Sequence, residues 1–317
     1  MTSEQVADAV RRVRETVASR VVGQEPVIDE VLVAFLARGH ALLEGVPGTA
    51  KTLLVRVLAG ALNAKFGRIQ FTPDLMPSDI TGINVLRPDG SAEFHPGPIY
   101  TDVLLADEIN RAPAKTQAAL LEAMQERQST TDGVGRPLGD LFTVFATMNP
   151  VEYEGTYPLP EAQLDRFLLK IKVPYPSKES ELKMLDNVAG GFDSEKASDV
   201  TPAPVLNAER CRALRAAVDA VKVAPEVREY ITAIVRATRE DSSLTLGGSP
   251  RATVALMRVA RAAALIAARD FVTPDDVKDF ALPVLRHRVV VAPELEVEGR
   301  SSDDILQALL TRVPAPQ

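Results

Sequence analysis

The sequence predicts an α/β domain with a five-stranded parallel sheet, followed by a domain made of helices. Two observations support this fold class. Five short apolar runs alternate with mostly helical segments over about the first 175 residues, which is typical of a parallel sheet covered on both faces. Beyond residue 178 the chain is rich in alanine and charge and shows mainly helical patterns.

The first domain begins with helices and then the expected sheet. The opening segment places valines from Val6 to Val17 at helical spacing among charges, which predicts an amphipathic helix and not a signal peptide. A second helix is expected after Gly23, with Pro26 in its first turn. The expected strands are HALLEG (40–45), RIQFT (68–72), DVLLAD (102–107), FTVFATM (142–148) and LLKIKVP (168–174), with helices at 52–63 and 113–127.

Two excursions interrupt this alternation. Residues 83–97 (INVLRPDGSAEFHPG) predict a β-hairpin around Asp89-Gly90, and residues 128–140 (QSTTDGVGRPLGD) predict another. Hairpins that project from the core are elements to which a partner can bind.

The second half predicts a helical domain. Helices are expected within 206–221, 224–240, 249–270 and 273–289, the last with Thr273 as N-cap and Pro274 in the first position. Residues 288–299 (RVVVAPELEVEG) form the only strand-like insertion. We therefore expect domains at 1–186 and 205–317, with 187–204 as a flexible linker.

Composition narrows the functional classes. The net charge is −7 and the pI near 5.2, which disfavours nucleic acid as the main partner because duplex-binding domains need basic faces. A single cysteine, Cys211, allows no internal disulfide, so a cytoplasmic location is expected. No apolar run is long enough to insert into a membrane. His40, His95 and His287 lack metal-ligand spacing and are expected to be structural.

A phosphate-binding turn is expected between the first strand and its helix. GVPGTAKT (45–52) matches the P-loop pattern G-x-x-x-x-G-K-[ST] except at Ala50. In such a turn backbone N–H groups and the lysine contact phosphates, and the hydroxyl reaches Mg²⁺. We expect Ala50 to be tolerated because the residue that starts a helix can be right-handed. The residues predicted to bind ATP or ADP are Gly45, Val46, Pro47, Gly48, Thr49, Ala50, Lys51, Thr52 and Leu53.

Acidic and amide side chains follow two other strands. Asp107 ends the run VLLAD and is predicted, with Thr52, to hold Mg²⁺, while Glu108 is predicted to polarise the attacking water. Asn149 follows the fourth strand, where its amide could orient that water. An Asn-Pro turn that only caps the strand is the alternative for Asn149.

Five motifs in order give the chain a specific resemblance. GVPGTAKT, VLLADEINRAPAKTQAALLEAMQE, ATMNP, LPEAQLDRF and GGSPRA together resemble the MoxR family of AAA+ ATPases, within the group whose second helix is interrupted by a hairpin. The likeness covers nearly the whole chain. It implies a five-stranded parallel P-loop core with a C-terminal all-α lid. It also implies an ATP-driven chaperone, usually a hexameric homo-oligomeric ring, which matures a metalloenzyme or complex, often with a partner bearing a von Willebrand factor A domain.

The resemblance also assigns roles to single residues. It implies that Asn149 is the first sensor, that Arg166 is an arginine finger offered to a neighbouring subunit, and that Arg251 is the second sensor on the lid. Arg111 is a rival for the contact with a neighbour's phosphates. By resemblance only, Gln24 and the backbone around Val22 flank the adenine.

Several functions remain in competition at this point. The leading hypothesis is an ATPase motor that remodels a protein client, and the main alternative is a nucleotide-dependent scaffold whose turnover is incidental. The complete set Lys51, Asp107, Glu108 and Asn149 favours the motor. A nucleic-acid motor is disfavoured by the acidic balance and the aromatic-poor hairpins, whereas a magnesium-chelatase-like motor subunit lies close to the leading hypothesis.

Overall fold

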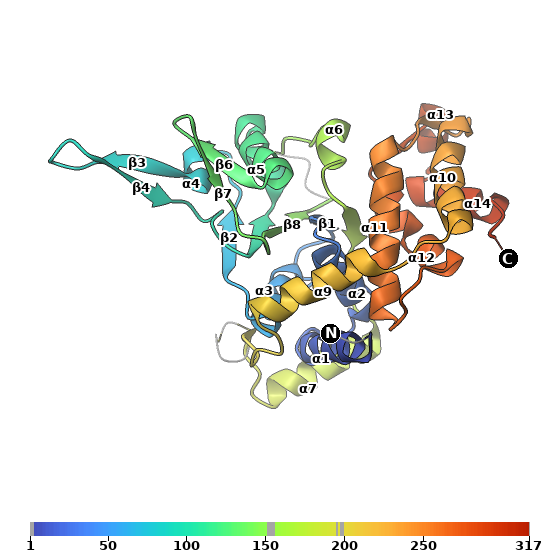
Figure 1. Cartoon of the computed structure of the whole chain (residues 1–317), viewed down its shortest axis with the longest axis horizontal. Helices are drawn as coiled ribbons and strands as arrows, with labels where there is room; N and C mark the ends of the chain where they lie inside the picture. The colour runs from blue at the N-terminus through green and yellow to red at the C-terminus, as the bar shows by residue number, and fades with distance from the viewer. Residues whose placement is uncertain (1–2, 151–155, 195, 197–199, 317) are drawn as a thin grey trace.

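The computed structural model describes residues 3–150, 156–194, 196 and 200–316. Its centre is a five-stranded sheet in the order β2-β5-β8-β1-β9, with every neighbouring pair parallel, as predicted (Figure 1). The strands are β1 (Ala41–Glu44), β2 (Phe66–Gln70), β5 (Val103–Asp107), β8 (Thr143–Met148) and β9 (Leu169–Lys172).

Successive residues of the central strands are mostly apolar, and their side chains point alternately to the two sides of the sheet. Both faces of the sheet are therefore apolar. Leu42, Leu104 and Val144 belong to one buried cluster, which α4 (Pro77–Thr81) and α5 (Ala114–Glu126) cover. Leu43 and Leu105 belong to a second cluster on the other face. This second cluster continues without a break into the C-terminal helices, so the core and the helical region share buried apolar surface.

Three N-terminal helices cover the second face. α1 (Ser3–Ala18) and α2 (Glu25–Leu36) pack on each other, and α1 also contacts α3 (Lys51–Ala61). The turn at Gly23 has φ 76° and Pro26 lies in the first turn of α2, as the sequence predicts. Short helical turns follow β5 and precede β9, namely η1 (Ile109–Arg111) and α6 (Glu161–Leu164).

Both predicted hairpins are present. β3 (Gly82–Leu86) pairs with β4 (Ala92–Pro96), and β6 (Gln128–Thr131) pairs with β7 (Val134–Pro137), in each case antiparallel. Figure 1 shows the β3–β4 hairpin extending away from the body, on the side opposite the C-terminal helices. The hairpins touch each other, since the Asn84 side chain donates to Asp132 at 2.6 Å and the Arg136 guanidinium lies over the Phe94 ring.

The C-terminal region is helical, as predicted. Its helices are α7 (Lys178–Ala189), α9 (Ala208–Ala220), α10 (Pro225–Glu240), α11 (Pro250–Ile266), α12 (Pro274–Leu285), α13 (Pro293–Val297) and α14 (Ser302–Arg312). Thr273 caps α12, with its hydroxyl accepting from the Asp276 N–H. α11 packs on α2, and α12 packs on β9.

The strand-like insertion predicted over 288–299 is mostly wrong. Only β11 (Val290–Val291) is a strand, and it pairs with β10 (Leu244–Leu246), which the sequence analysis did not identify. The alternating residues that follow form α13 instead, because Pro293 suits a first helical position and Glu294 and Glu296 favour the positive end of the helix dipole.

The predicted domain boundary at residue 186 falls inside α7. Part of the predicted linker 187–204, residues 195 and 197–199, lies outside the described residues, so the linker and the division into domains stay predictions. Over the residues that the structure describes, no helix is both long and apolar enough to cross a membrane.

Candidate functional site

The P-loop turns from β1 into the first turn of α3. Gly45 packs so closely on β9 that a Cβ there would lie 2.6 Å from the carbonyl oxygen of Val173, and Gly48 has φ 84°. The Lys51 Nζ donates to the carbonyl oxygens of Gly45 and Val46 at 2.6 and 2.7 Å. Burial lowers the pKa of Lys51, and the charges of Asp107 and Glu108 oppose that shift. The ammonium group is therefore held at the centre of the turn.

Ala50 differs from its expected conformation. It has φ 61° and ψ 20°, in the left-handed region and not the right-handed region that the sequence analysis assumed. The residue lies just before the first helical residue, at a position where the chain has not yet entered the helix. Glycine adopts this conformation without the steric penalty that a Cβ brings, so Ala50 introduces local strain.

The carboxylate of Asp107 is buried at the carboxyl end of β5 and has three partners. Its Oδ1 accepts from Thr147 at 2.6 Å, and its Oδ2 accepts from Arg68 at 2.7 Å and from Thr52 at 3.4 Å. A hydroxyl and a carboxylate are the hard oxygen ligands that Mg²⁺ prefers. Arg68 is about half exposed, with 49% of its side chain accessible, so it can withdraw from the carboxylate when a cation binds. The donor set thus fits the predicted metal site.

Glu108 adjoins this carboxylate in a strained backbone conformation, with φ 56°. Its N–H donates to the Thr147 hydroxyl at 2.8 Å, and its Oε2 accepts from Gln70 at 2.7 Å and from Arg111 at 3.1 Å. Thr147 therefore joins the two acidic residues through one hydroxyl. Arg111, the rival arginine, lies against the Glu108 of its own chain.

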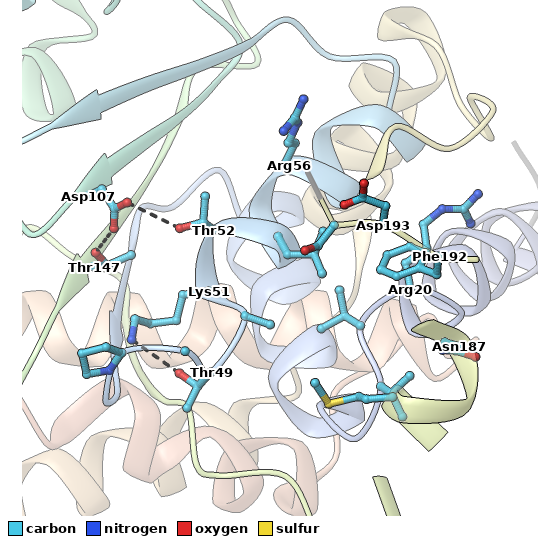
Figure 2. Close-up of a pocket in the computed structure, with 18 of the residues that line it drawn as sticks. Arg20, Thr49, Lys51, Thr52, Arg56, Asp107, Thr147, Asn187, Phe192 and Asp193 are labelled. Atoms are coloured by element: carbon cyan, nitrogen blue, oxygen red, sulfur yellow. Dashed lines mark hydrogen bonds between the residues drawn. The ribbon is translucent and has the colours of Figure 1, made fainter. Parts of the chain in front are cut away.

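Lys51, Thr52, Asp107, Glu108 and Thr147 line one cavity of about 940 Å³, here called the P-loop cavity. In Figure 2, Lys51, Thr52 and Asp107 lie at one end, and Arg20, Asn187 and Phe192 lie at the other. Because β8 adjoins β1, as expected, Asn149 also lines the cavity, together with Val22 and Leu53. The full lining runs over residues 20–22, 47–53, 56, 107–108, 147–149, 184, 187–188 and 191–194.

Several lining residues were missed from sequence. Thr147 is one of two hydroxyl residues in the otherwise apolar strand β8 and lies near its carboxyl end, which is a detectable signal. Arg20, Phe192 and Asp193 carry no motif. Arg20 follows α1, and Phe192 and Asp193 reach the cavity because α7 and the chain after it fold back over the P-loop (Figure 2). A cavity with a polar end for phosphates and a partly apolar end suits a nucleotide.

Comparisons with known proteins agree with this geometry. The family model described as "ATPase family associated with various cellular activities (AAA)" matches residues 40–169, and that of the AAA lid domain matches residues 236–309. Chaperone MoxR1 of Mycobacterium tuberculosis is 41% identical over 94% of this chain and 80% of its own. This chain belongs to the MoxR family of AAA+ ATPases. Protein MoxR of Methylorubrum extorquens is 32% identical over 98% of this chain and 96% of its own.

The MoxR-family fold is also found among solved structures. A crystal structure of a protein from Cytophaga hutchinsonii is 40% identical, covers 99% of this chain and 97% of its own, and superposes with a TM-score of 0.90. The P-loop core followed by a helical lid is therefore the shared architecture. Membership in the AAA+ ATPases also implies nucleotide binding.

Two predicted residues of this MoxR-family chain lie away from the P-loop cavity. Arg166 lies in the short connection that leads into β9. In this connection the Leu168 N–H donates to the carbonyl oxygen of His40 at 2.7 Å, and His40 is the residue just before β1. The P-loop follows the other end of β1, so Arg166 and the P-loop occupy opposite edges of the sheet. Arg251, on α11, lies 3.9 Å from Asp165 and thus joins Arg166 at the amino edge.

Other predicted residues of the MoxR-family chain have structural contacts. Gln24 is buried and donates to the Pro174 carbonyl at 2.9 Å, and it does not line the P-loop cavity. His40 accepts from the Val144 N–H through Nδ1 and lies 3.1 Å from the Met124 carbonyl through Nε2, and burial lowers its pKa to about 3. His287 and Cys211 are also buried, in agreement with structural roles.

Proposed function

We propose that this chain is a Mg²⁺-dependent ATPase that converts ATP and water to ADP and phosphate and uses the turnover to remodel a protein client. One observation carries the proposal: the groups that phosphoryl transfer requires, a lysine, a hydroxyl, two carboxylates and an amide, line a single cavity of about 940 Å³. The relative from Mycobacterium tuberculosis is itself called a chaperone.

Each group has a distinct proposed role. Lys51 and the N–H groups of residues 46–52 bind the phosphates, and Thr52 and Asp107 hold Mg²⁺, which would neutralise charge on the phosphate oxygens. Glu108 accepts a proton from the attacking water, and Asn149 orients that water. Thr147, through the contacts described above, keeps the two carboxylates in fixed relative positions.

The site is completed by a second copy of the chain. Arg166 and Arg251 lie at the amino edge of the sheet, whereas the P-loop leaves the carboxyl edge, and β1 between them spans roughly 13 Å by the usual rise of a strand. Neither arginine can contact the phosphates of its own chain in this arrangement. A homo-oligomeric ring, as in hexameric AAA+ proteins, would bring them to a neighbour's ATP.

The hairpins are the proposed client-binding elements. They expose apolar side chains far from the P-loop cavity, with Ile83 49%, Leu86 77% and Val134 52% accessible. Exposed apolar residues on projecting elements suit a transient protein partner. The client class that the family suggests is a metalloenzyme or complex under maturation, with a von Willebrand factor A-domain protein as partner.

Calorimetry with ATP and Mg²⁺ tests the proposal together with a turnover assay. Lys51→Ala should abolish ATP binding, and Glu108→Gln should bind ATP normally yet lose about 10²-fold or more in turnover. Lys115→Ala, an exposed lysine on α5 outside the cavity, is the matched control and should behave as the parent. Unchanged ATP affinity in Lys51→Ala would reject the site, and unchanged turnover in Glu108→Gln would leave a binding scaffold as the better function.

A further inference from the structure

A second cavity, of about 590 Å³, lies at the amino edge of the sheet, between the ends of α2 and α5, the connection from α6 to β9, and α11. It is unusually cationic, because six arginines and only one carboxylate, that of Asp165, contribute to its lining. We call it the arginine cavity. The six arginines are Arg38, Arg127, Arg166, Arg251, Arg258 and Arg288.

Three of these six arginines make no direct ion pair with a described residue. Arg38 pairs with Asp219 at 2.9 Å, and Arg288 and Arg251 share Asp165 at 2.7 and 3.9 Å. Within the part of the chain that the structure describes, Arg127, Arg166 and Arg258 form no ion pair with a carboxylate. In a chain with a net charge of −7, this concentration of positive charge needs a reason.

Arg127 and Arg258 are held side by side against the end of α2. The Arg127 Nη2 donates to the Arg38 carbonyl at 2.8 Å, and the Arg258 Nη2 donates to the Ala37 and Arg38 carbonyls at 2.5 and 3.3 Å. Burial lowers the pKa of both groups and the neighbouring arginines lower it further, while the charges of Asp140 and Asp219 oppose these shifts. The pair is thus partly desolvated and mutually repelling, and a polyanion would relieve that repulsion.

The backbone turns sharply at two of these arginines. Arg38 and Arg127 follow the ends of α2 and α5 with φ 53° and 52°. Helices often end in this left-handed conformation, but usually with glycine, because other residues pay roughly 1–2 kcal/mol for it. Both arginines therefore stand where the chain turns out of a helix at the rim of the arginine cavity.

We propose that the arginine cavity receives the triphosphate of ATP bound to a neighbouring copy, and that Arg127 and Arg258 contact those phosphates together with Arg166 and Arg251. The inference rests on the proposed function, which already assigns the last two residues to a neighbour's site. It adds two phosphate-contacting arginines and a defined receptor for the anion. The alternative is that Arg127 and Arg258 only cap the carbonyl groups of α2.

Sedimentation of the Glu108→Gln chain, with and without ATP and Mg²⁺, separates the two roles. In this background the double change Arg127→Gln and Arg258→Gln should weaken ATP-dependent self-association about tenfold or more, because charge-assisted contacts to phosphate are lost. The affinity of the dilute subunit for ATP should stay the same. Arg236→Gln, at an exposed arginine on α10, should leave both quantities unchanged.

A double lysine substitution separates the loss of phosphate contacts from a loss of structure. The double variant Arg127→Lys and Arg258→Lys keeps both positive charges and a donor for the α2 carbonyls. It lacks the paired guanidinium donors that bind a phosphate in bidentate fashion. Self-association in ATP should therefore weaken about threefold while the Tm stays unchanged. Two results would overturn the inference: association in ATP as tight as the parent's in both double variants, or equal weakening with and without ATP. Absence of ATP binding to the Glu108→Gln chain would instead reject the proposed function.

Discussion

Two residues of the P-loop cavity hold backbone conformations that their side chains disfavour. Ala50 has φ 61° and Glu108 has φ 56°. Such strain persists only where the surrounding contacts hold the backbone in that conformation, and strained residues are concentrated at functional sites. The motif predicted which residues form the site, but its spacing does not report φ. This is why the right-handed conformation expected for Ala50 was wrong.

We predict that Ala50→Gly stabilises the protein. Glycine removes the Cβ penalty of the left-handed conformation but adds unfolded-state entropy, so the net gain in unfolding free energy should be about 0.5–1 kcal/mol. Urea denaturation measures this gain. Ala59→Gly, within α3, is the matched control and should lose about 1 kcal/mol. A less stable Ala50→Gly protein would contradict the assigned conformation.

A partly buried carboxyl on α2 gives the protein a predicted pH dependence. Burial raises the pKa of Glu30 to about 7, Asp303 and Asp29 add to the shift, and Arg286 opposes it. Because the folded-state pKa lies above the unfolded value, stability is fully present below about pH 4.5 and falls as the pH rises through 7.

Glu30→Gln, which stays neutral, should therefore stabilise the protein selectively at high pH. The gain should be small near pH 4.5 and reach about 2 kcal/mol at pH 8. Urea midpoints at the two pH values measure it. A gain of equal size at both would mean that ionisation of Glu30 does not destabilise the fold.

At the scale of elements, the sheet was predictable and the cavity wall was not. The central strands β1, β5 and β8 are buried on both faces, so each appears as a continuous apolar run. β10 has only three residues and depends on its partner β11, which no local pattern reveals. The α7 wall of the P-loop cavity depends on long-range packing, and α7 has no buried residue to mark it in the sequence.

Helix α9 carries a buried arginine that hydrogen-bonds to the core. Arg215 is 2% exposed and donates to the carbonyls of Phe35 and Asp140 at 3.0 and 2.6 Å and to the Thr143 hydroxyl at 2.8 Å. Burial lowers the pKa of Arg215 to about 9. A core position with this hydrogen-bonding was not evident from sequence, where arginine is expected on the surface.

Arg215→Met should cost about 3 kcal/mol or more in unfolding free energy, because it leaves several buried acceptors without a donor. The matched control is Arg212→Met on the same helix, where an exposed pair with Asp140 should contribute less than about 1 kcal/mol. Chemical denaturation of both variants measures the difference. Equal costs would mean that the Arg215 hydrogen bonds do not secure α9.

At the scale of the whole molecule, the structure separates two groups of residues that we propose form one reaction site. The P-loop cavity opens at the carboxyl edge of the sheet, and Arg166 and Arg251 lie with the arginine cavity at the amino edge. Figure 1 shows helices α10 to α14 gathered on the side away from the hairpins. A closed ring would place one subunit's arginine cavity against the next subunit's ATP.

The most direct test of this account is ATP hydrolysis by mixed subunits. Arg166→Ala and Glu108→Gln chains should each be nearly inactive, since a trans arginine is worth on the order of 10³ to 10⁵ in rate. Mixed together and shown to co-assemble, they should regain activity, because an intact Glu108 then meets a neighbour's intact Arg166 at some boundaries. No recovery in co-assembled mixtures, or full activity in a demonstrable monomer, would contradict a site shared between subunits.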